Sequence, residues 1–266
     1  MPVTRVSYHD LPAAVRDAIE DTIGPVVNAA PSSAGMNSAI AATLHTTSGS
    51  YFVKALPTSH RWVWTQQREA DIAPYLRAVA PALVDHLVMD DWDLLIFEAL
   101  DGHHADYSPG SPDLPKILDL LNRISHTPTP DVELRDAAQR LADYTTHKAD
   151  LEYFTGGSLL HTDWNNTNVI VGEQARIVDW GWATRGAPWL DAGYWIIWLI
   201  AAGHSPQAAE ERAAHIQAWT SATPDAVTAF AAVNARLWAD IGADRPDSWT
   251  RALVTASAQW QRHRSG

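Results

Sequence analysis

The amino-acid sequence predicts an α+β fold, with a strand-rich first part followed by a mainly helical second part. In the first part, short apolar runs are separated by turn residues, which is the pattern of an antiparallel sheet. In the second part, apolar residues recur every three or four positions, as in helices that bury one face. Between the two parts, residues 105–115 contain Gly110 and three prolines, which indicates a loop. We therefore predict two lobes, residues 1–100 and 101–266.

The predicted first lobe is an antiparallel sheet accompanied by one helix. The sequence Ser-Gly-Ser at residues 48–50 indicates the turn of a hairpin. Apolar residues at helical spacing between residues 61 and 80 predict a helix that ends before Pro81. The last strand of the lobe is nearly all apolar, so we expect it to be central in the sheet. The strands are expected at residues 39–46, 51–56, 83–89 and 94–100.

The predicted second lobe is helical apart from one small hairpin, residues 169–171 and 175–178. Residues 190–203 are apolar except for Asp191, and they are too few for a membrane-spanning helix, which needs about 20 residues. A buried core helix explains this segment. The other helices are expected at residues 114–125, 134–151, 206–220, 226–241 and 248–263.

The composition excludes several classes of function. The chain of 266 residues has no cysteine, so it has no disulfide, no thiolate metal site and no cysteine nucleophile. Its formal net charge of -12 disfavours a nucleic-acid partner, because such binding depends on clustered Lys and Arg. The N-terminal residues lack the apolar segment of a secretory signal. We expect a cytoplasmic protein, monomeric or homodimeric, with no membrane partner.

The most informative segment is HTDWNNTN at residues 161–168, followed by the predicted hairpin and by IVDWG at residues 177–181. Phosphoryl transfer needs a carboxylate that receives the acceptor's proton and hard oxygen ligands that hold Mg²⁺ against the phosphates. Asp163 can serve as the base. Asn168, five residues later, and Asp179, returned to its side by the hairpin, can serve as the two Mg²⁺ ligands.

These residues resemble the catalytic core of the aminoglycoside phosphotransferase family, distant relatives of the protein kinases. The resemblance implies a two-lobed protein-kinase-like fold, with a nucleotide-binding N-terminal lobe and a C-terminal lobe for catalysis and acceptor binding. It assigns the catalytic role to Asp163 and metal binding to Asn168 and Asp179. It further implies that Lys54, in the strand YFVKAL, contacts the nucleotide phosphates and that Glu69 is its ion-pair partner.

The resemblance also implies the remaining nucleotide contacts. Residues 33–38 (SAGMNS) would cover the phosphates of ATP or GTP, and the end of the strand LLIFEALDG would be the interlobe hinge, at about residues 98–101, that binds the adenine edge. Asp191 would cap its helix and support the catalytic loop without taking part in the chemistry. The residues assigned to nucleotide binding are Lys54, Glu69, Ser33, Gly35, Asn37, Ser38, Glu98, Ala99 and Leu100.

The sequence departs from the family pattern in three respects. Thr162 replaces the usual glycine of the catalytic loop, which is expected to alter the loop backbone slightly. Trp164, Trp180 and Trp182 place large aromatic rings near the metal ligands, either as walls of the acceptor pocket or as packing. The predicted phosphate loop has a single glycine, Gly35, so no phosphate-binding glycine signature supports it.

Each candidate residue also has a simpler interpretation. Lys54 could be a solvated lysine near a strand end, and Asn37 and Ser38 could form a polar turn. His161 is interpreted as a residue that hydrogen-bonds the loop, because the neighbouring aspartate already fills the role of base. His103, His104 and Asp106 suggest a metal site, but adjacent histidines point in different directions, and we favour a solvated loop.

The predicted function is transfer of the γ-phosphate of ATP or GTP to a hydroxyl of a small molecule, in the presence of Mg²⁺. The resemblance implies acceptors such as aminoglycosides or other antibiotics, sugars and amino alcohols, so antibiotic resistance is one outcome among several. Two alternatives stay open. One is a kinase that acts on a peptide or protein hydroxyl, and the other is a catalytically silent nucleotide-binding module.

Overall fold

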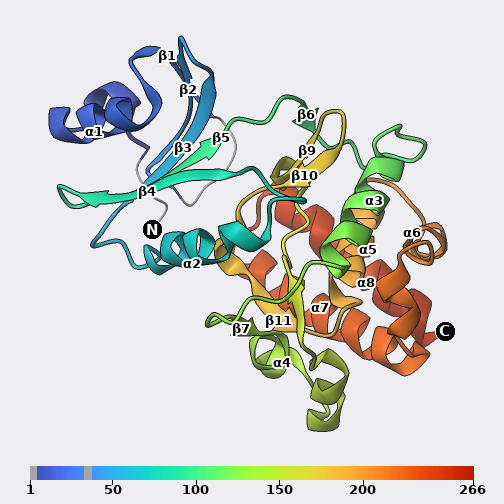
Figure 1. The fold of residues 1–266 in the computed structure, drawn as a ribbon. Coiled ribbons are helices and arrows are strands. Elements are labelled where there is room, and N and C mark those ends of the chain that lie inside the picture. The colour runs from blue at the N-terminus through green and yellow to red at the C-terminus, as the bar shows by residue number, and fades with distance from the viewer. Residues whose placement is uncertain (1–4, 33–37) are drawn as a thin grey trace. The chain divides into compact units, whose positions relative to one another are not determined.

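The computed structural model describes residues 5–32 and 38–266, which form two compact units. The first unit comprises Met1–Gly102 together with Val178–Gly181, and the second comprises His103–Ile177 together with Trp182–Gly266. A five-stranded antiparallel sheet lies in the first unit, and most helices lie in the second (Figure 1). The α+β fold predicted from the sequence is confirmed.

The sheet of the first unit has the strand order β1-β2-β3-β5-β4, and every neighbouring pair is antiparallel. The four strands expected from the sequence are all present, and the nearly all-apolar β5 lies in the sheet interior as expected. The structure adds a fifth strand, β1, at one edge. The bounds are β1 (Val26–Pro31), β2 (Ile40–Thr46), β3 (Ser50–Pro57), β4 (Leu83–Met89) and β5 (Trp92–Glu98).

A helix that the sequence analysis missed, α1 (Ala13–Ile23), covers one face of this sheet (Figure 1). Val15, Ile19 and Ile23 follow one another at four-residue spacing, which aligns them on one helix face. All three are buried against apolar side chains of β2, β3 and β5. The helix ends at Gly24, whose φ of 87° is readily adopted only by glycine. The four-residue spacing was a readable signal for this helix.

The helix predicted for residues 61–80 is shorter in the structure. It divides into α2 (Trp64–Ile72) and a single 3₁₀ turn, Ala73–Tyr75. Pro74 explains the difference, because its ring excludes the backbone of the preceding turn and it has no N–H to donate. The apolar residues Leu76 and Val79 are buried all the same, outside the α-helix.

The second unit contains five longer helices and two small three-stranded sheets. Aromatic rings fill the space between the helices: Phe230 contacts Trp189, Tyr194 and Trp260 at ring-centroid distances of 5.0 to 6.1 Å. The longer helices are α3 (Leu114–Ser125), α5 (Leu190–Ala201), α6 (Pro206–Ala213), α7 (Pro224–Asp244) and α8 (Ser248–Ser265).

The two small sheets surround the segment that carries the catalytic motif. One has the order β10-β9-β6 and contains the predicted hairpin, and the other has the order β7-β11-β8. Strand β8 leads into the catalytic loop and β9 leaves it. The strands are β6 (His103–His104), β7 (Arg135–Asp136), β8 (Ser158–Leu160), β9 (Val169–Val171), β10 (Ala175–Ile177) and β11 (Thr184–Gly186).

Two of the predicted helices are interrupted in the structure. The segment 134–151 forms β7, the short helix α4 (Ala137–Leu141) and two 3₁₀ segments, because Asp136 is an extended N-cap and the backbone becomes extended again at Thr145. The segment 206–220 leaves the α-helix after residue 213. It bends at Ile216, which has an extended backbone and a side chain that is 1% exposed. At Ile216, burial of the side chain outweighs helical periodicity.

No helix within residues 5–32 and 38–266 combines the length and the apolar character that crossing a bilayer requires.

Candidate active site

Lys54 lies at the centre of a cluster of charges in the first unit. It stands in β3, opposite Ala41 of β2 and Leu95 of β5. Its Nζ forms an ion pair with the carboxylate of Glu69 from α2 and a second one, at 3.0 Å, with Oδ1 of Asp179. The Lys54 and Glu69 side chains are 11% and 6% exposed, so this lysine is not the solvated one of the simpler interpretation.

The charges of this cluster depend on one another. Burial by itself lowers the pKa of Lys54, but the negative charges of Asp179 and Glu69 outweigh burial, and the pKa of the ammonium is raised. Burial raises the pKa of the Glu69 carboxyl, and the positive charge of Lys54 opposes that rise. Lys54 is therefore a fully charged cation at neutral pH, held by two carboxylates.

The turn that carries Asp179 is tightly constrained. Asp179 has a φ of 68°, in the left-handed region, which costs a non-glycine residue about 1–3 kcal/mol. Two residues later, a Cβ on Gly181 would lie 2.8 Å from Cβ of Thr65 and 3.1 Å from its backbone oxygen. Only glycine fits where this turn passes α2. The Asp-x-Gly sequence thus has a steric reason in this chain.

A buried polar group attaches α2 to the sheet. Gln66 is 2% exposed, and its Nε2 donates to the backbone oxygen of Asp93 at 2.5 Å and to Oδ1 of the same residue at 2.8 Å. His86 Nε2 lies 3.0 Å from the same carboxylate oxygen. Because Gln66 and Glu69 are three residues apart, they share the buried face of α2. The sequence analysis missed these residues.

In the second unit, Asp191 organises the start of the catalytic loop. Its carboxylate accepts the backbone N–H groups of His161 at 2.9 Å and Thr162 at 2.8 Å. Asp191 is 4% exposed. Burial raises the pKa of its carboxyl, and the hydrogen bonds from these N–H groups oppose that rise. It stands in the first turn of α5, but it binds the loop and no N-cap bond of its own helix is formed by a side chain.

The loop presents Asp163 to solvent and fixes its neighbours. Asp163 is exposed, and its backbone N–H donates to Nδ1 of His161 at 3.2 Å. The buried His161 ring thus supports the loop. Asn168 Nδ2 donates to Oδ2 of Asp163 at 3.0 Å, so the amide oxygen of Asn168 is directed elsewhere. Asn166 fastens the loop to the segment after β6 through a 3.1 Å bond to the oxygen of Ala105.

Thr162 has a backbone conformation in the left-handed region. Its φ is 70°, which is a rare conformation for a β-branched residue. Its Oγ1 accepts a 2.7 Å hydrogen bond from Nη1 of Arg140, a residue of α4. The same Nη1 donates to Oγ1 of Thr184 in β11. Nothing in the spacing of the sequence signalled Arg140.

Two of the three tryptophans near the motif pack in the interior. Trp164 and Trp180 are 0% and 2% exposed, whereas Trp182 is half-buried and has the Arg135 guanidinium 4.9 Å from its ring centroid. Tyr107 is a further buried residue that sequence reasoning missed. Its hydroxyl has no hydrogen-bond partner among the residues described, and burial together with the charge of Asp163 raises its pKa well above the ordinary value.

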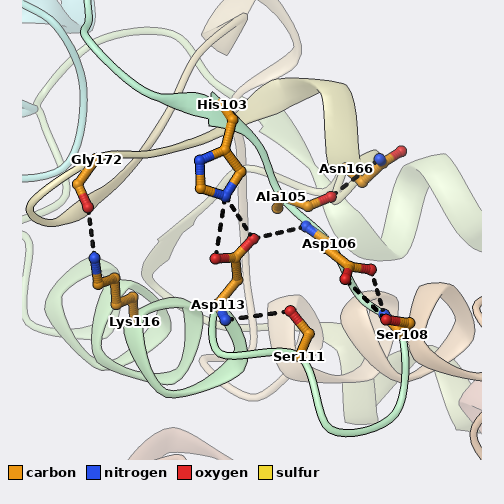
Figure 2. A network of polar contacts seen from close by, with 9 residues as sticks. All are labelled: His103, Ala105, Asp106, Ser108, Ser111, Asp113, Lys116, Asn166 and Gly172. Carbon is orange, nitrogen blue, oxygen red and sulfur yellow. Dashed lines mark hydrogen bonds and ion pairs between the residues drawn. The ribbon is translucent and has the colours of Figure 1, made fainter.

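Figure 2 shows the polar contacts around His103, which together with His104 forms the short strand β6 and not the expected loop. His103 Nε2 contacts both carboxylate oxygens of Asp113, at 3.0 and 3.2 Å, and Asp113 also accepts the N–H of Asp106. His103 is therefore paired, although its side chain is 64% exposed. Within the described part of the chain, no three His, Cys, Asp or Glu side chains gather in a way that would hold a metal ion.

The predicted nucleotide contacts are only partly described. Ser33, Gly35 and Asn37 lie outside the described residues, and Ser38 is the half-buried first residue after that gap. In the segment predicted as the hinge, the N–H of Glu98 donates to the oxygen of Ala82 and that of Ala99 donates to the oxygen of Ser50, at 2.9 and 3.2 Å. These two donors are already engaged in the protein.

A comparison with protein families finds a match over part of the chain. Residues 113–230 match the phosphotransferase enzyme family. The match includes Asp163, Asn168, Asp179 and Asp191. It agrees with the resemblance seen in the sequence, over the part of the chain that carries the motif. A comparison with curated protein sequences finds no match.

Solved structures of phosphotransferases share the fold at low sequence identity. One is a putative aminoglycoside phosphotransferase from Ralstonia eutropha, with a TM-score of 0.64 and 15% identity over 96% of this chain and 97% of that one. Another is the choline kinase LicA from Streptococcus pneumoniae, with a TM-score of 0.63 and 12% identity over 95% and 99%. A third is a thermostable mutant of the aminoglycoside phosphotransferase APH(4)-Ia in complex with ADP and hygromycin B, with a TM-score of 0.60 and 14% identity over 95% and 98%. They confirm the kinase-like fold.

Proposed function

We propose that this chain transfers the γ-phosphate of ATP or GTP to a hydroxyl of a small molecule, with Mg²⁺ as the metal. The observation that carries the proposal is the position of Lys54 between Glu69 and Asp179. A buried cation with two carboxylates is expensive to maintain, and a protein without phosphate chemistry gains little from it. A silent nucleotide-binding module would not need all three charges.

In this proposal Asp163 is the catalytic base. The acceptor oxygen attacks the γ-phosphorus, the bond from the γ-phosphorus to the β,γ-bridging oxygen breaks, and the nucleoside diphosphate leaves with that electron pair. The acceptor proton passes to the Asp163 carboxylate. The exposure of Asp163 suits this role, because an acceptor molecule can reach it. The bond from Asn168 holds the carboxylate in one orientation.

The residues assigned to the metal have suitable chemistry. The amide oxygen of Asn168 and the carboxylate of Asp179 are hard oxygen ligands of the kind that Mg²⁺ prefers, and the Asp179 side chain is 40% exposed. Two protein ligands are enough, since Mg²⁺ usually completes its shell with water and substrate phosphates. The metal would supply positive charge that stabilises the transferring phosphoryl group.

The nucleotide contacts follow from the same arrangement. We expect Lys54 to contact the phosphates, Glu69 to orient it, residues 33–38 to cover the phosphates and the backbone at Leu100 to bind the base. The structure of APH(4)-Ia with ADP and hygromycin B supports a nucleotide and a small hydroxylated acceptor for this fold. The net charge of -12 favours a cationic acceptor such as an aminoglycoside or an amino alcohol. A cytoplasmic location and a monomeric or homodimeric state stay predictions.

The experiment is a nucleotide-consumption assay with Mg²⁺ against a panel of aminoglycosides, other hydroxylated antibiotics, sugars, amino alcohols and a mixed peptide substrate. ATP and GTP are tested in parallel, and Asp163→Ala is the control. We expect one class of small acceptor to stimulate consumption, with mass spectrometry showing the phosphorylated product. We expect Asp163→Ala to lower kcat about 10³-fold.

Three other results would redirect the assignment. Phosphorylation of the peptide alone would favour a protein kinase. Nucleotide binding without turnover on any acceptor would favour a silent module. Equal activity of the wild type and Asp163→Ala would remove Asp163 from the chemistry.

A further inference from the structure

Thr162 poses a problem for the catalytic loop. The residue directly before Asp163 has a φ of 70°, which glycine adopts freely and threonine does not. The direction in which the chain leaves residue 162 determines where the Asp163 carboxylate lies. A threonine at this position therefore needs other contacts that hold its backbone in place.

Two hydrogen bonds hold Thr162 from opposite ends of the residue. The backbone N–H donates to Oδ1 of Asp191 at 2.8 Å, and the side-chain Oγ1 accepts from Nη1 of Arg140 at 2.7 Å. The second bond depends on the hydroxyl that glycine lacks. It joins the catalytic loop to a charged donor, and hydrogen bonds of this kind are about twice as strong as neutral ones.

Arg140 is itself held by the small sheet β7-β11-β8. It follows β7 in α4, whose first turn is capped by Asp136 through a 2.9 Å bond to the N–H of Gln139. Its Nη1 also donates to Oγ1 of Thr184, which is fully buried and itself donates a hydrogen bond to the backbone oxygen of Trp182 at 2.8 Å. Thr184 pairs with Leu160, two residues before Thr162. The guanidinium thus has a fixed position beside the loop.

We propose that Arg140 and Thr162 form a positioning pair that keeps the Thr162 backbone in its left-handed conformation and so aims Asp163 at the acceptor. The role rests on the proposed function, because Asp163 is the base there. The pair does not touch the reacting atoms. It replaces, by a side-chain hydrogen bond, the conformational freedom that a glycine would provide.

The test is a set of variants at Thr162 with kcat and KM measured for nucleotide and acceptor. Thr162→Val keeps the branched shape and removes the hydroxyl, and we expect kcat to fall about 10- to 100-fold with each KM within about twofold. Thr162→Ser keeps the hydroxyl and should retain near wild-type kcat. Thr162→Gly should also retain most of it, because glycine adopts this φ without help. Thr255→Val, at an exposed position of α8, is the matched control and should change nothing.

A double-mutant cycle then links the two residues. Arg140→Met should lower kcat as Thr162→Val does, but should have little further effect in the Thr162→Gly background. Arg123→Met, which removes another half-buried arginine bonded to a backbone oxygen, is the control for loss of an arginine in general. An equal loss from Arg140→Met in both backgrounds would overturn the proposal, and so would wild-type kcat in Thr162→Val. If Arg140→Met does not fold, Arg140→Lys takes its place and the Thr162 series still decides.

Hydrogen exchange provides a readout that does not need turnover. Exchange in a peptide covering residues 158–168 should be faster in Thr162→Val and Arg140→Met, and unchanged in Thr162→Ser and Thr162→Gly. If the wild type phosphorylates no acceptor, the proposed function fails. The exchange result alone then shows whether Arg140 and Thr162 hold the loop in place. Unchanged exchange in Thr162→Val would reject that role.

Discussion

The charge cluster of Lys54, Glu69 and Asp179 and the catalytic loop at residues 161–168 are held in place by different forces. In the cluster, ionised side chains compensate one another inside the protein. In the loop, hydrogen bonds predominate: the buried carboxylate of Asp191 accepts neutral backbone donors, and the Arg140 guanidinium, the His161 ring, amides and hydroxyls form the other contacts. The cluster is thus vulnerable to the loss of one charge, whereas the loop depends on several hydrogen bonds.

The largest effect on stability is expected from breaking the charge cluster. Lys54→Met leaves Glu69 buried without its cation, and removal of one partner from a buried ion pair costs about 3–5 kcal/mol. Lys54→Met/Glu69→Gln should recover a substantial part of that loss, since no isolated charge remains. Urea denaturation of the three proteins measures the free energies of unfolding. If the double variant were less stable than Lys54→Met, the cost of that single change would not come from the unpaired charge of Glu69.

Asp191→Ala should have the next largest effect. The change leaves the buried N–H groups of His161 and Thr162 without acceptors, which costs about 1–3 kcal/mol for each group that water cannot reach. Asp191→Asn keeps one acceptor oxygen and should lose less stability. Urea denaturation measures the free energy of unfolding of both variants, and kcat is measured alongside it. Unchanged stability in Asp191→Ala would contradict the role of Asp191 as the acceptor for these buried N–H groups.

Gln66→Leu tests the polar attachment of α2, which carries Glu69. Two hydrogen bonds to Asp93 are lost, and the buried carboxylate keeps His86 as a neighbour, so we expect a loss of about 1–3 kcal/mol. The matched control is Gln67→Leu, the next residue, which is exposed and bonds to Asp71 at 2.8 Å. It should change the stability by less than about 0.5 kcal/mol. Equal effects of the two changes would contradict the role of Gln66.

The smallest effect on stability is expected from lowering the pH, which protonates the buried side chain of His204. His204 is 7% exposed and its Nε2 donates to the oxygen of Tyr107 at 2.9 Å. Burial lowers the pKa of His204, and the nearby charge of Arg212 lowers it further, although the bond to Tyr107 opposes this. The unfolded chain therefore binds a proton at a higher pH than the folded one.

The sign of the pH dependence follows from this pKa. Stability is complete above the ordinary His pKa of 6.5 and falls as the pH drops below that value towards the folded pKa. Melting temperatures of the wild type and His204→Gln between pH 7.5 and 5 provide the test. The melting temperature of the wild type should fall more on acidification than that of His204→Gln. Equal falls in the two proteins would contradict the lowered pKa of His204.

Much of the site could be predicted because its signals are local. The interval from Asp163 to Asn168 and the hairpin that precedes Asp179 are contained in about twenty consecutive residues, and the structure has that hairpin as β9 and β10. The prediction of Lys54 and Glu69 relied on the family resemblance, and the structure brings their side chains together. Their catalytic roles stay predictions until the variants are measured.

Other features had no local signal. Arg140 is 22 residues from Thr162 and 44 from Thr184, and no periodicity relates the three positions. Gln66 and Asp93 are 27 residues apart. The φ of Thr162 is likewise invisible in a sequence, where a threonine indicates an extended or helical backbone. These contacts exist because the fold places distant segments side by side.

The sequence by itself determined the α+β class, four of the five strands of the main sheet, most of the long helices and the order of the catalytic motif, because hydrophobic periodicity and motif spacing are properties of consecutive residues. Tertiary structure decided where the predicted helices at 134–151 and 206–220 break, how α2 is attached and how Thr162 is held. Those outcomes depend on burial and on hydrogen bonds between distant segments, whose free energy outweighs local helical propensity.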